Sequence, residues 1–426
     1  MRSLFAPAAL ALSAAFAAGA SQLPNAAEHP SIAYSTSTPT DAVAKLQERM
    51  DAGEVTLEFD EARGYLPAVL RQLEIPVSSQ MLVFSKTSLQ LDRIAPWSPR
   101  ALYFNDDVYV GWVQGGPIME LASVDPKLGT VFYTIRQDPA GKPRFEREGH
   151  TCLVCHDSSS VTGGVPGLIV RSVMPDRYGY GITPIGRSVT TDQSPIGERW
   201  GGWYVTGTHG DQQHMGNVIV PALAHEIGNV KSYLAKTPPP PAGNVTSLED
   251  RFDTSAYLTE HSDLVALMVL SHQAYIHNLI TVANYAARRG TDDIAAAAEP
   301  LVRALFFSRA ADWNGAMKGT SGFAAEFAAR GPRDGNGRSL RDLDLETRLF
   351  RYPLSYLIYS ESFDALPAAA REYVYRRIRE VLTGADAGKD FAHLTDVDRR
   401  AILQILEETK PAFRASTSTE SSDPPR

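Results

Sequence analysis

Two cysteines and the histidine that follows them form the motif in this chain with the clearest chemistry. They stand in the run Cys152-Leu153-Val154-Cys155-His156, which has the pattern C-x-x-C-H. In this pattern each thiol can form a thioether with one vinyl group of a haem, and the histidine can ligate the iron. These are the only two cysteines in 426 residues. The motif therefore predicts one covalently attached haem c, held by Cys152 and Cys155 with His156 as an axial ligand.

Two other uses of such a cysteine pair fit the sequence less well. A structural zinc site needs four nitrogen or sulfur ligands, usually from two paired motifs, and a second pair is missing here. A thioredoxin-like redox pair would follow a buried strand in a βαβ pattern. Residues 143–151, which precede the motif, are mostly polar. Haem attachment is therefore the preferred interpretation.

The first twenty residues have the features of an export signal. Arg2 supplies a positive charge, residues 4–17 are apolar, and Ala18-Gly19-Ala20 is a run of small residues. This pattern predicts a signal peptide that is cleaved after Ala20. The apolar run is too short for a lasting membrane span, and no later membrane segment is expected. Because c-type haem is attached outside the cytoplasmic membrane, both features predict a periplasmic or secreted protein.

The charge of the mature chain restricts its partners. Without Arg2 the chain has 40 basic and 49 acidic side chains, a net charge near −9. This acidity argues against nucleic acid as a partner, since a nucleic-acid-binding surface is basic. It suits a positively charged redox partner protein, because complementary charge speeds diffusional encounter. The oligomeric state is left open.

Hydrophobic periodicity divides the chain into a β-rich part and a helical part. Residues 41–50 have helical spacing with Asp41 as the N-cap, and residues 101–112 and 119–135 each have two strand-like runs joined by turn residues, which predicts a β-hairpin. We therefore predict an α+β protein with the following segments: signal peptide 1–20, flexible N-terminus 21–40, helix and β-rich segment 41–140, haem domain 141–236, proline linker 237–243, all-α region 244–413 and disordered tail 414–426.

The helices expected beyond the proline linker include one of unusual length at 263–289. It contains His272 and His277, whose five-residue spacing places them on different faces and argues against a shared metal ion. We expect one of them either to be buried against the haem domain or to cap a polar network. The other predicted helices are 294–309, 342–359, 365–382 and 396–408.

Residues 141–236 resemble a class I cytochrome c domain. The features that carry the resemblance are Gly141 and Phe145 before the cysteines, the C-x-x-C-H motif, Pro166 ten residues after it, and the apolar spacing of residues 225–234. The resemblance implies a mainly α-helical haem segment with residues 225–234 as its closing helix. It also implies that the carbonyl of Pro166 accepts a hydrogen bond from Nδ1 of His156, which would fix the ring.

The ligand on the far side of the iron separates the possible functions. Met215, just before the expected closing helix, is the preferred sixth ligand, while Met174, His209, His214 and an open site remain alternatives. Methionine or histidine ligation would make an electron carrier, whereas an open iron would allow peroxidase or oxygenase chemistry. Single-electron transfer is the leading prediction. A haem enzyme is the main alternative, and a haem-based sensor or binding module is a third.

Overall fold

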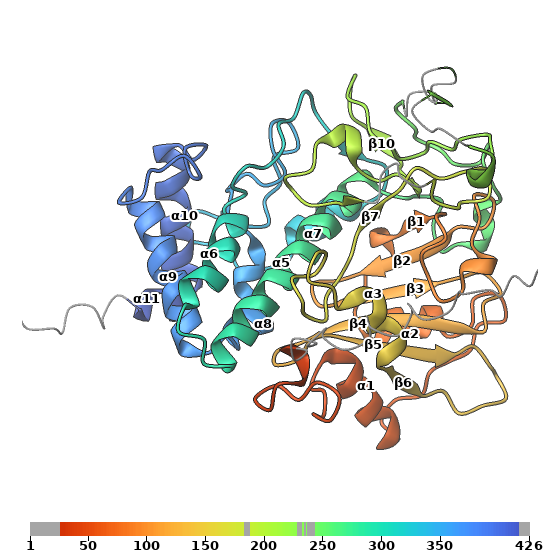
Figure 1. Cartoon of the computed structure of the whole chain (residues 1–426), viewed down its shortest axis with the longest axis horizontal. Helices are drawn as coiled ribbons and strands as arrows, with labels where there is room; N and C mark the ends of the chain where they lie inside the picture. The colour runs from red at the N-terminus through yellow and green to blue at the C-terminus, as the bar shows by residue number, and fades with distance from the viewer. Residues whose placement is uncertain (1–25, 183–187, 228–231, 234–235, 237–242, 417–426) are drawn as a thin grey trace, which may run out of the picture.

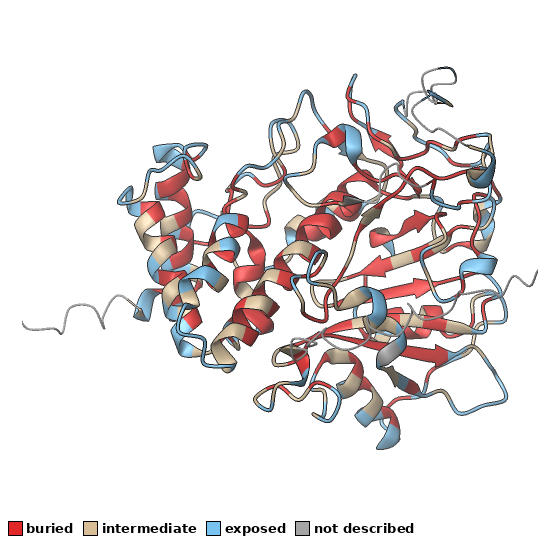
Figure 2. Ribbon diagram, viewed as in Figure 1, coloured by how far each residue is buried: buried red, intermediate tan, exposed pale blue. Residues whose placement is uncertain are grey.

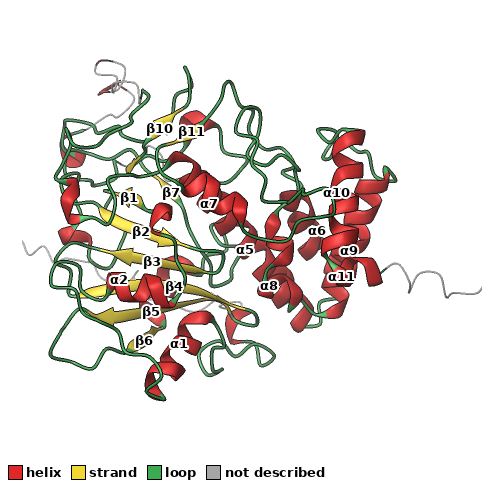
Figure 3. Ribbon diagram, turned by 180° about the vertical axis from the view of Figure 1, so that it is seen from behind, coloured by secondary structure: helices red, strands yellow, loops and turns green. Residues whose placement is uncertain are grey.

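A computed structural model describes residues 26–182, 188–227, 232–233, 236 and 243–416 (Figure 1). The predicted signal peptide, the proline run and half of the expected closing helix at 225–234 lie outside the described residues. Within them, a seven-stranded antiparallel sheet is combined with α-helices, which confirms the predicted α+β class. The strands gather on one side of the molecule and most of the C-terminal helices on the other (Figures 1 and 3).

The main sheet has the strand order β6-β5-β4-β3-β2-β1-β9. Both predicted hairpins are present, β2–β3 and β4–β5, and their turns have clear chemical causes. In the first, the Asn105 side-chain oxygen accepts bonds from the backbone N–H groups of residues 107 and 108. In the second, Asp125 does the same for residues 127 and 128, and Gly129 takes a positive φ. The strand bounds are β1 Met81–Val83, β2 Arg100–Phe104, β3 Val108–Trp112, β4 Ile118–Asp125, β5 Gly129–Arg136, β6 Phe145–Glu148 and β9 Trp203–Tyr204.

Successive side chains of a strand point to opposite faces of the sheet, and the two faces differ here. We call the first the closed face, because its side chains belong to one buried hydrophobic cluster: Leu82, Ala101, Tyr103, Val108, Val110, Trp112, Met119, Leu121, Val131, Tyr133 and Ile135. We call the second the cavity face, because its side chains line a cavity: Met81, Val83, Arg100, Leu102, Phe104, Tyr109, Gly111, Glu120, Ala122, Phe132 and Thr134.

The N-terminal part of the chain covers the closed face. Helix α1 (Ala42–Asp51) packs against β4 and β6, and α2 (Leu66–Gln72) adds Leu66 to the same cluster. Asp41 caps α1 through its side chain, as predicted. Residues 26–40, predicted to be flexible, instead lie packed, with Ile32 and Tyr34 fully buried. The Tyr34 hydroxyl donates a hydrogen bond to the carbonyl of residue 130, which holds this segment against the sheet.

A single long helix, α5 (Leu264–Arg288), covers part of the cavity face. It is long and apolar enough to cross a membrane by length and composition, although no such segment was expected after the signal peptide. In the folded chain, however, 83% of its most apolar window is buried inside the protein. Figure 2 colours most of this helix as buried. Its residues share one hydrophobic cluster with Met81, Phe104 and Tyr109 of the sheet. Burial of this extent is typical of a helix in the core of a folded protein.

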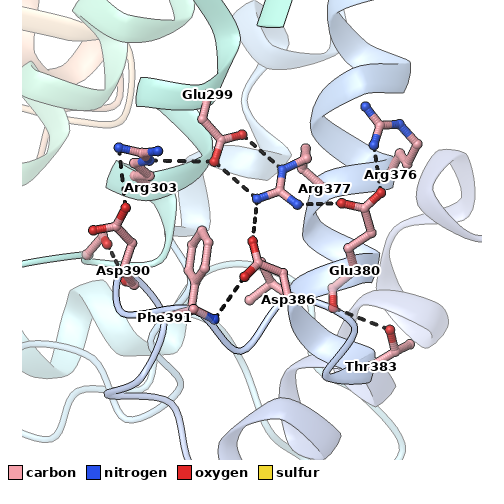
Figure 4. A network of polar contacts seen from close by, with 12 residues as sticks. Glu299, Arg303, Arg376, Arg377, Glu380, Thr383, Asp386, Asp390 and Phe391 are labelled. Atoms are coloured by element: carbon pink, nitrogen blue, oxygen red, sulfur yellow. Dashed lines mark hydrogen bonds and ion pairs between the residues drawn. The ribbon is translucent and has the colours of Figure 1, made fainter. Parts of the chain in front are cut away.

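The remaining helices form a second layer beside α5. Helices α6 and α9 pack together and are joined by Arg377, which pairs with Glu299 at 3.0 Å and with Asp386 at 2.6 Å (Figure 4). The bounds are α6 Ile294–Leu305, α7 Phe323–Ala329, α8 Glu361–Asp364, α9 Ala368–Thr383, α10 Asp396–Thr409 and α11 Pro411–Ala415. Short 3₁₀ turns are η1 Ala26–Glu28, η2 Val77–Ser79, η3 Leu91–Arg93, η4 Ile196–Glu198, η5 Ala224–Glu226, η6 Thr254–Ala256 and η7 Tyr356–Tyr359.

Two predicted helical segments differ from the structure. The prediction of a helix at 342–359 is wrong. The carboxylate of Asp344 accepts hydrogen bonds from the backbone N–H groups of residues 346 and 347, and Leu345 has a positive φ. Pro353 has no backbone N–H to donate within a helix. The mainly helical layout of 141–236 is also absent from its described residues. They form a single helix longer than one turn, α3 (His150–His156), with loops and the short strands β7 Arg171–Ser172, β8 Ser188–Val189 and β10 Gly207–Thr208.

The segments predicted from the sequence do not have separate hydrophobic cores. One hydrophobic cluster joins the sheet, residues 168–205 and the helices from α5 onward, and the other joins the N-terminal segment, the closed face and residues 248–257. A short strand of the helical region, β11 (Lys318–Gly319), pairs with β10. The strands, the described part of residues 141–236 and the helices therefore pack as one body.

Candidate functional site

A cavity of about 480 Å³ lies on the cavity face of the sheet. Its walls come from the sheet, from α3, from residues 168–173 and from Leu270 and Ala274 of α5. Cys152, Cys155 and His156 all line it. The volume is within the range of sites that bind small molecules and cofactors, about 300–1,000 Å³. All three residues of the motif therefore line the same cavity.

Helix α3 presents the two thiols on the same side because residues three apart in a helix share a face. It is seven residues long and follows β6 directly, so a strand precedes the motif after all. Both thiols are free, with Cys152 half-buried and Cys155 exposed. Burial, together with the nearby carboxylates of Glu148 and Glu120, raises the pKa of Cys152 to about 11. The thiol is therefore protonated at neutral pH in this environment.

The imidazole of His156 is held by two contacts. Its Nδ1 lies 2.8 Å from the carbonyl oxygen of Gly167, and its ring packs on Phe132 with centroids 4.7 Å apart. Because a carbonyl can only accept, Nδ1 carries the proton and Nε2 has the lone pair. Loss of hydration is the main cause that lowers the pKa of His156, so the ring is neutral at pH 7. A neutral imidazole with a fixed tautomer is the form that ligates a metal.

The acceptor of this bond is one residue beyond the predicted one. We expected the carbonyl of Pro166, but that oxygen accepts from the backbone N–H of Thr130 instead, at 3.2 Å. This pairing ties the loop to the start of β5 and turns the next carbonyl, that of Gly167, toward His156. The backbone N–H of Gly167 in turn donates to the carbonyl of His156 at 2.9 Å. The two residues are therefore joined by a reciprocal pair of hydrogen bonds.

Helix α5 fixes this loop from the other side through Asn278. The side-chain oxygen of Asn278 accepts from the N–H of Leu168, and its amide donates to the carbonyl of the same residue, both at 2.8 Å. A β-carbon on Gly167 would overlap this amide, so only glycine fits between helix and loop. The orientation of His156 therefore depends on a residue that lies more than a hundred positions later in the chain.

Most of the remaining wall is apolar, but a charged pair lies within it. Arg100 and Glu120 form an ion pair at 2.9 Å with 17% and 13% of their side chains exposed. Glu120 also accepts from the hydroxyl of Ser88. The Nε of Arg100 is buried and has no hydrogen-bond partner among the described residues. Lys86 and Arg171 also line the cavity, so it has donors for an anionic group.

Gly111 makes room for the Arg100 guanidinium, which passes across the centre of the sheet. A β-carbon at position 111 would overlap this guanidinium. The small residue Ala122 lies diagonally across the strand pair from Gly111, which pairs with Glu120 of β4. Small side chains at these positions leave the space that larger ones fill on the closed face.

The candidates for the sixth ligand lie elsewhere. Met215 and Met174 belong to a separate small hydrophobic cluster, and the Sδ of Met215 lies 3.8 Å from the hydroxyl of Ser172. His209 and His214 contact each other in a loop beyond Trp200. None of the four lines the cavity, whereas a methionine that the sequence reasoning did not consider, Met81 on β1, does. Their assignment as iron ligands stays a prediction.

The two histidines of α5 are fully buried in polar contacts. His272 lies 2.7 Å from Asp192 and 2.8 Å from the hydroxyl of Ser355, and His277 donates to the carbonyl of Asp106. Burial lowers the pKa of His277 to about 4. The predicted role in a buried polar network is therefore confirmed, and it applies to both residues.

The residues that sequence reasoning missed are those that position the motif: Gly167, Phe132 and Asn278. A glycine after a proline is an ordinary turn signal, and an asparagine inside an apolar helix is the one local hint, because a buried amide needs partners. Among the described residues no group of three or more His, Cys, Asp or Glu side chains is arranged to hold a metal ion. Comparison with family models, curated proteins and solved structures found no match. The function must be argued from the site itself.

Proposed function

We propose that this chain is an exported monohaem c-type cytochrome that transfers single electrons to and from a redox partner protein. In this proposal Cys152 and Cys155 hold one haem c through thioethers, and His156 is an axial iron ligand. The observation that carries the proposal is the C-x-x-C-H motif, whose three functional side chains line a single cavity. The predicted signal peptide agrees with it, because such haems are attached after export.

The residues around the cavity fit a haem. A porphyrin is a large apolar disc, and Val83, Leu102, Phe104 and Leu168 supply apolar walls. Its two propionates are anionic, and the buried Nε of Arg100 has a free donor to offer them. Lys86 and Arg171 are further donors at the cavity. Both a place for the ring and partners for its carboxylates are therefore available.

The bound haem would supply the one-electron redox chemistry. The protein would orient the proximal imidazole through Gly167 and Phe132, and the hydrogen bond at Nδ1 would strengthen its donation to the metal. Apolar walls exclude water and raise the cost of net charge, which affects the reduction potential. The ion pair of Arg100 and Glu120 adds fixed charges beside the ring site.

A haem enzyme with an open or displaceable distal site is the second candidate. It is favoured by one observation: Met215, Met174, His209 and His214 do not line the cavity. If no side chain reaches the iron opposite His156, small oxidants would have access. The lining residue Met81 is the protein group that would instead close this position in an electron carrier.

The absorption spectrum of the full-length chain, made in a host with c-type haem maturation, tests both candidates. We expect a covalent haem whose ferric form shows the far-red band of methionine ligation, and loss of that band in either Met215→Ala or Met81→Leu would identify the ligand. A high-spin ferric spectrum that changes with cyanide or peroxide would favour the enzyme. A chain that acquires no covalent haem in such a host would refute the proposal.

A further inference from the structure

Two histidines outside the haem cavity form a buried pair whose polar atoms are left without partners. His209 follows β10 and His214 lies five residues later, and they are 2% and 5% exposed. Their ring centroids are 4.6 Å apart in an edge-to-face arrangement. Neither residue lines the cavity that contains His156. The pair is therefore a separate feature of the fold.

The hydrogen bonding of His209 fixes its tautomer. Its Nε2 lies 2.9 Å from the carbonyl oxygen of Gly243, and a carbonyl only accepts, so Nε2 carries the proton. The lone pair is then on Nδ1, which is buried and has no hydrogen-bond partner among the described residues. The backbone N–H of His209 donates to the side chain of Asn244 at 2.6 Å, which steadies the residue further. Histidines that ligate metals are held in this way, with the opposite N–H on a carbonyl.

His214 is also buried with unused ring nitrogens. Neither Nδ1 nor Nε2 has a hydrogen-bond partner among the described residues, and the Trp200 ring packs 5.4 Å from the imidazole. Burial, with a smaller contribution from His209, lowers the pKa of His214 to about 3, so the ring is neutral and has one lone pair. Leaving such groups unpaired costs free energy, and a ligand that accepts both lone pairs would remove part of this cost.

We propose that His209 and His214 together bind one divalent first-row transition metal ion, Cu²⁺ in preference to Zn²⁺. Neutral imidazole nitrogen suits these ions, whereas Mg²⁺ and Ca²⁺ require oxygen ligands. Rings this close allow one nitrogen of each to reach an ion at about 2.0–2.1 Å. The order Cu²⁺ over Zn²⁺ follows from the general affinity series of such sites. Two protein ligands leave the other coordination positions to solvent or a small anion.

The test uses the full-length chain with its two cysteines either bound to haem or alkylated, so that free thiols do not bind the metal. Calorimetric titration with Cu²⁺ and Zn²⁺ should show one ion per chain and tighter binding of Cu²⁺. His209→Ala and His214→Gln should each weaken binding by about tenfold or more. His225→Ala, a change at an exposed histidine, is the matched control and should leave it unchanged.

A spectroscopic measurement keeps the test independent of any variant's folding. The electron paramagnetic resonance spectrum of one bound Cu²⁺ in the alkylated chain without substitutions should show coupling to two imidazole nitrogens. Absence of binding by this chain, or equal binding by the His225 variant and both pair variants, would overturn the proposal. So would a changed haem spectrum in His209→Ala or His214→Gln, because it would make the residue an iron ligand.

Discussion

The two faces of the main sheet are made by alternate residues of the same strands, yet they have different contents. The closed face carries large apolar side chains such as Trp112, Met119 and Ile135, which share one buried hydrophobic cluster with residues of α1, α2 and the segment 26–40. The cavity face carries Gly111 and Ala122 at its centre and the Arg100–Glu120 ion pair across it. One face therefore contributes to stability by burial, and the other leaves space beside polar groups, as a binding site does.

The two faces of the sheet are also covered by different kinds of element. The closed face is covered by helices whose apolar side chains fill the gaps between its residues. The cavity face is covered by α5 at one end and by the short helix α3 with the loop to residue 168 elsewhere. That loop is attached through hydrogen bonds of Asn278 and Thr130. The cavity is thus enclosed on this side by a loop that side-chain and backbone hydrogen bonds hold in place.

The largest expected effect is the loss of haem from a chain that still folds. Replacing both motif cysteines, Cys152→Ser with Cys155→Ser, should abolish covalent haem, because no other thiol can form a thioether. A haem stain after denaturing electrophoresis measures this directly. Val154→Ala, at a position between the cysteines that is 68% exposed, should retain the haem and serves as the control. A stained band from the double variant would contradict the assignment.

The next largest effect comes from truncating one apolar side chain to alanine on each face of the sheet. The two variants should lose different amounts of unfolding free energy, because one face is filled and the other borders the cavity. Ile135→Ala on the closed face is expected to lower the free energy of unfolding by about 2–5 kcal/mol, since Ile135 is 0% exposed in a filled cluster. Leu102→Ala on the cavity face should cost less in the haem-free chain, where the side chain already borders open space. Urea unfolding of both variants in the haem-free cysteine background checks the order. Equal losses would remove the distinction between the faces.

The helix over the cavity face should make stability depend on pH through His277. Its pKa is lowered from 6.5 to about 4, so below pH 6.5 the unfolded chain binds a proton that the folded chain does not. Stability from this group is present in full above pH 6.5 and is lost as the pH falls toward 4, by about 3 kcal/mol.

His277→Gln should remove this part of the pH dependence, since a glutamine amide can still donate to the carbonyl of Asp106. The measurement compares the free energy of unfolding of the two proteins at pH 7 and pH 4.5. The difference between them should shrink at the lower pH. If it stays constant, His277 does not titrate between the folded and unfolded states as proposed.

The smallest expected effect comes from removing the hydrogen bonds by which Asn278 holds the loop at Leu168. Asn278→Ala should cost about 1–3 kcal/mol by leaving the backbone groups of Leu168 without partners. Asn284→Ala is the matched control, because it removes two side-chain hydrogen bonds of the same helix, one donated to the carbonyl of Pro126 and one accepted from Arg288. Only the first variant should shift the reduction potential and the haem spectrum, because Asn278, unlike Asn284, is bonded to the loop that orients His156. Identical spectra would limit Asn278 to a structural role.

Several elements could be predicted because their causes are local. The turn residues Asn105 and Asp125 mark the hairpins, Asp41 marks the start of α1, and a continuous apolar run marks α5. The failures have causes that local patterns do not contain. Residues 342–359 have helical spacing, but side-chain caps and Pro353 favour turns. The haem segment was expected to be helical from resemblance, and its fold instead depends on packing against the sheet and α5.

The sequence by itself determined where the residues that can do chemistry lie, in one C-x-x-C-H motif, and it predicted the paired strands that precede this motif. Only the tertiary structure decided which atoms surround that motif. Strand β3 is buried at all five positions, so alternation does not reveal which face is filled and which is open. The choice of Gly167 over Pro166 as the acceptor for His156 depends on contacts with Asn278 and Thr130. Such contacts join segments far apart in the chain, and their geometry is fixed only when those segments pack together.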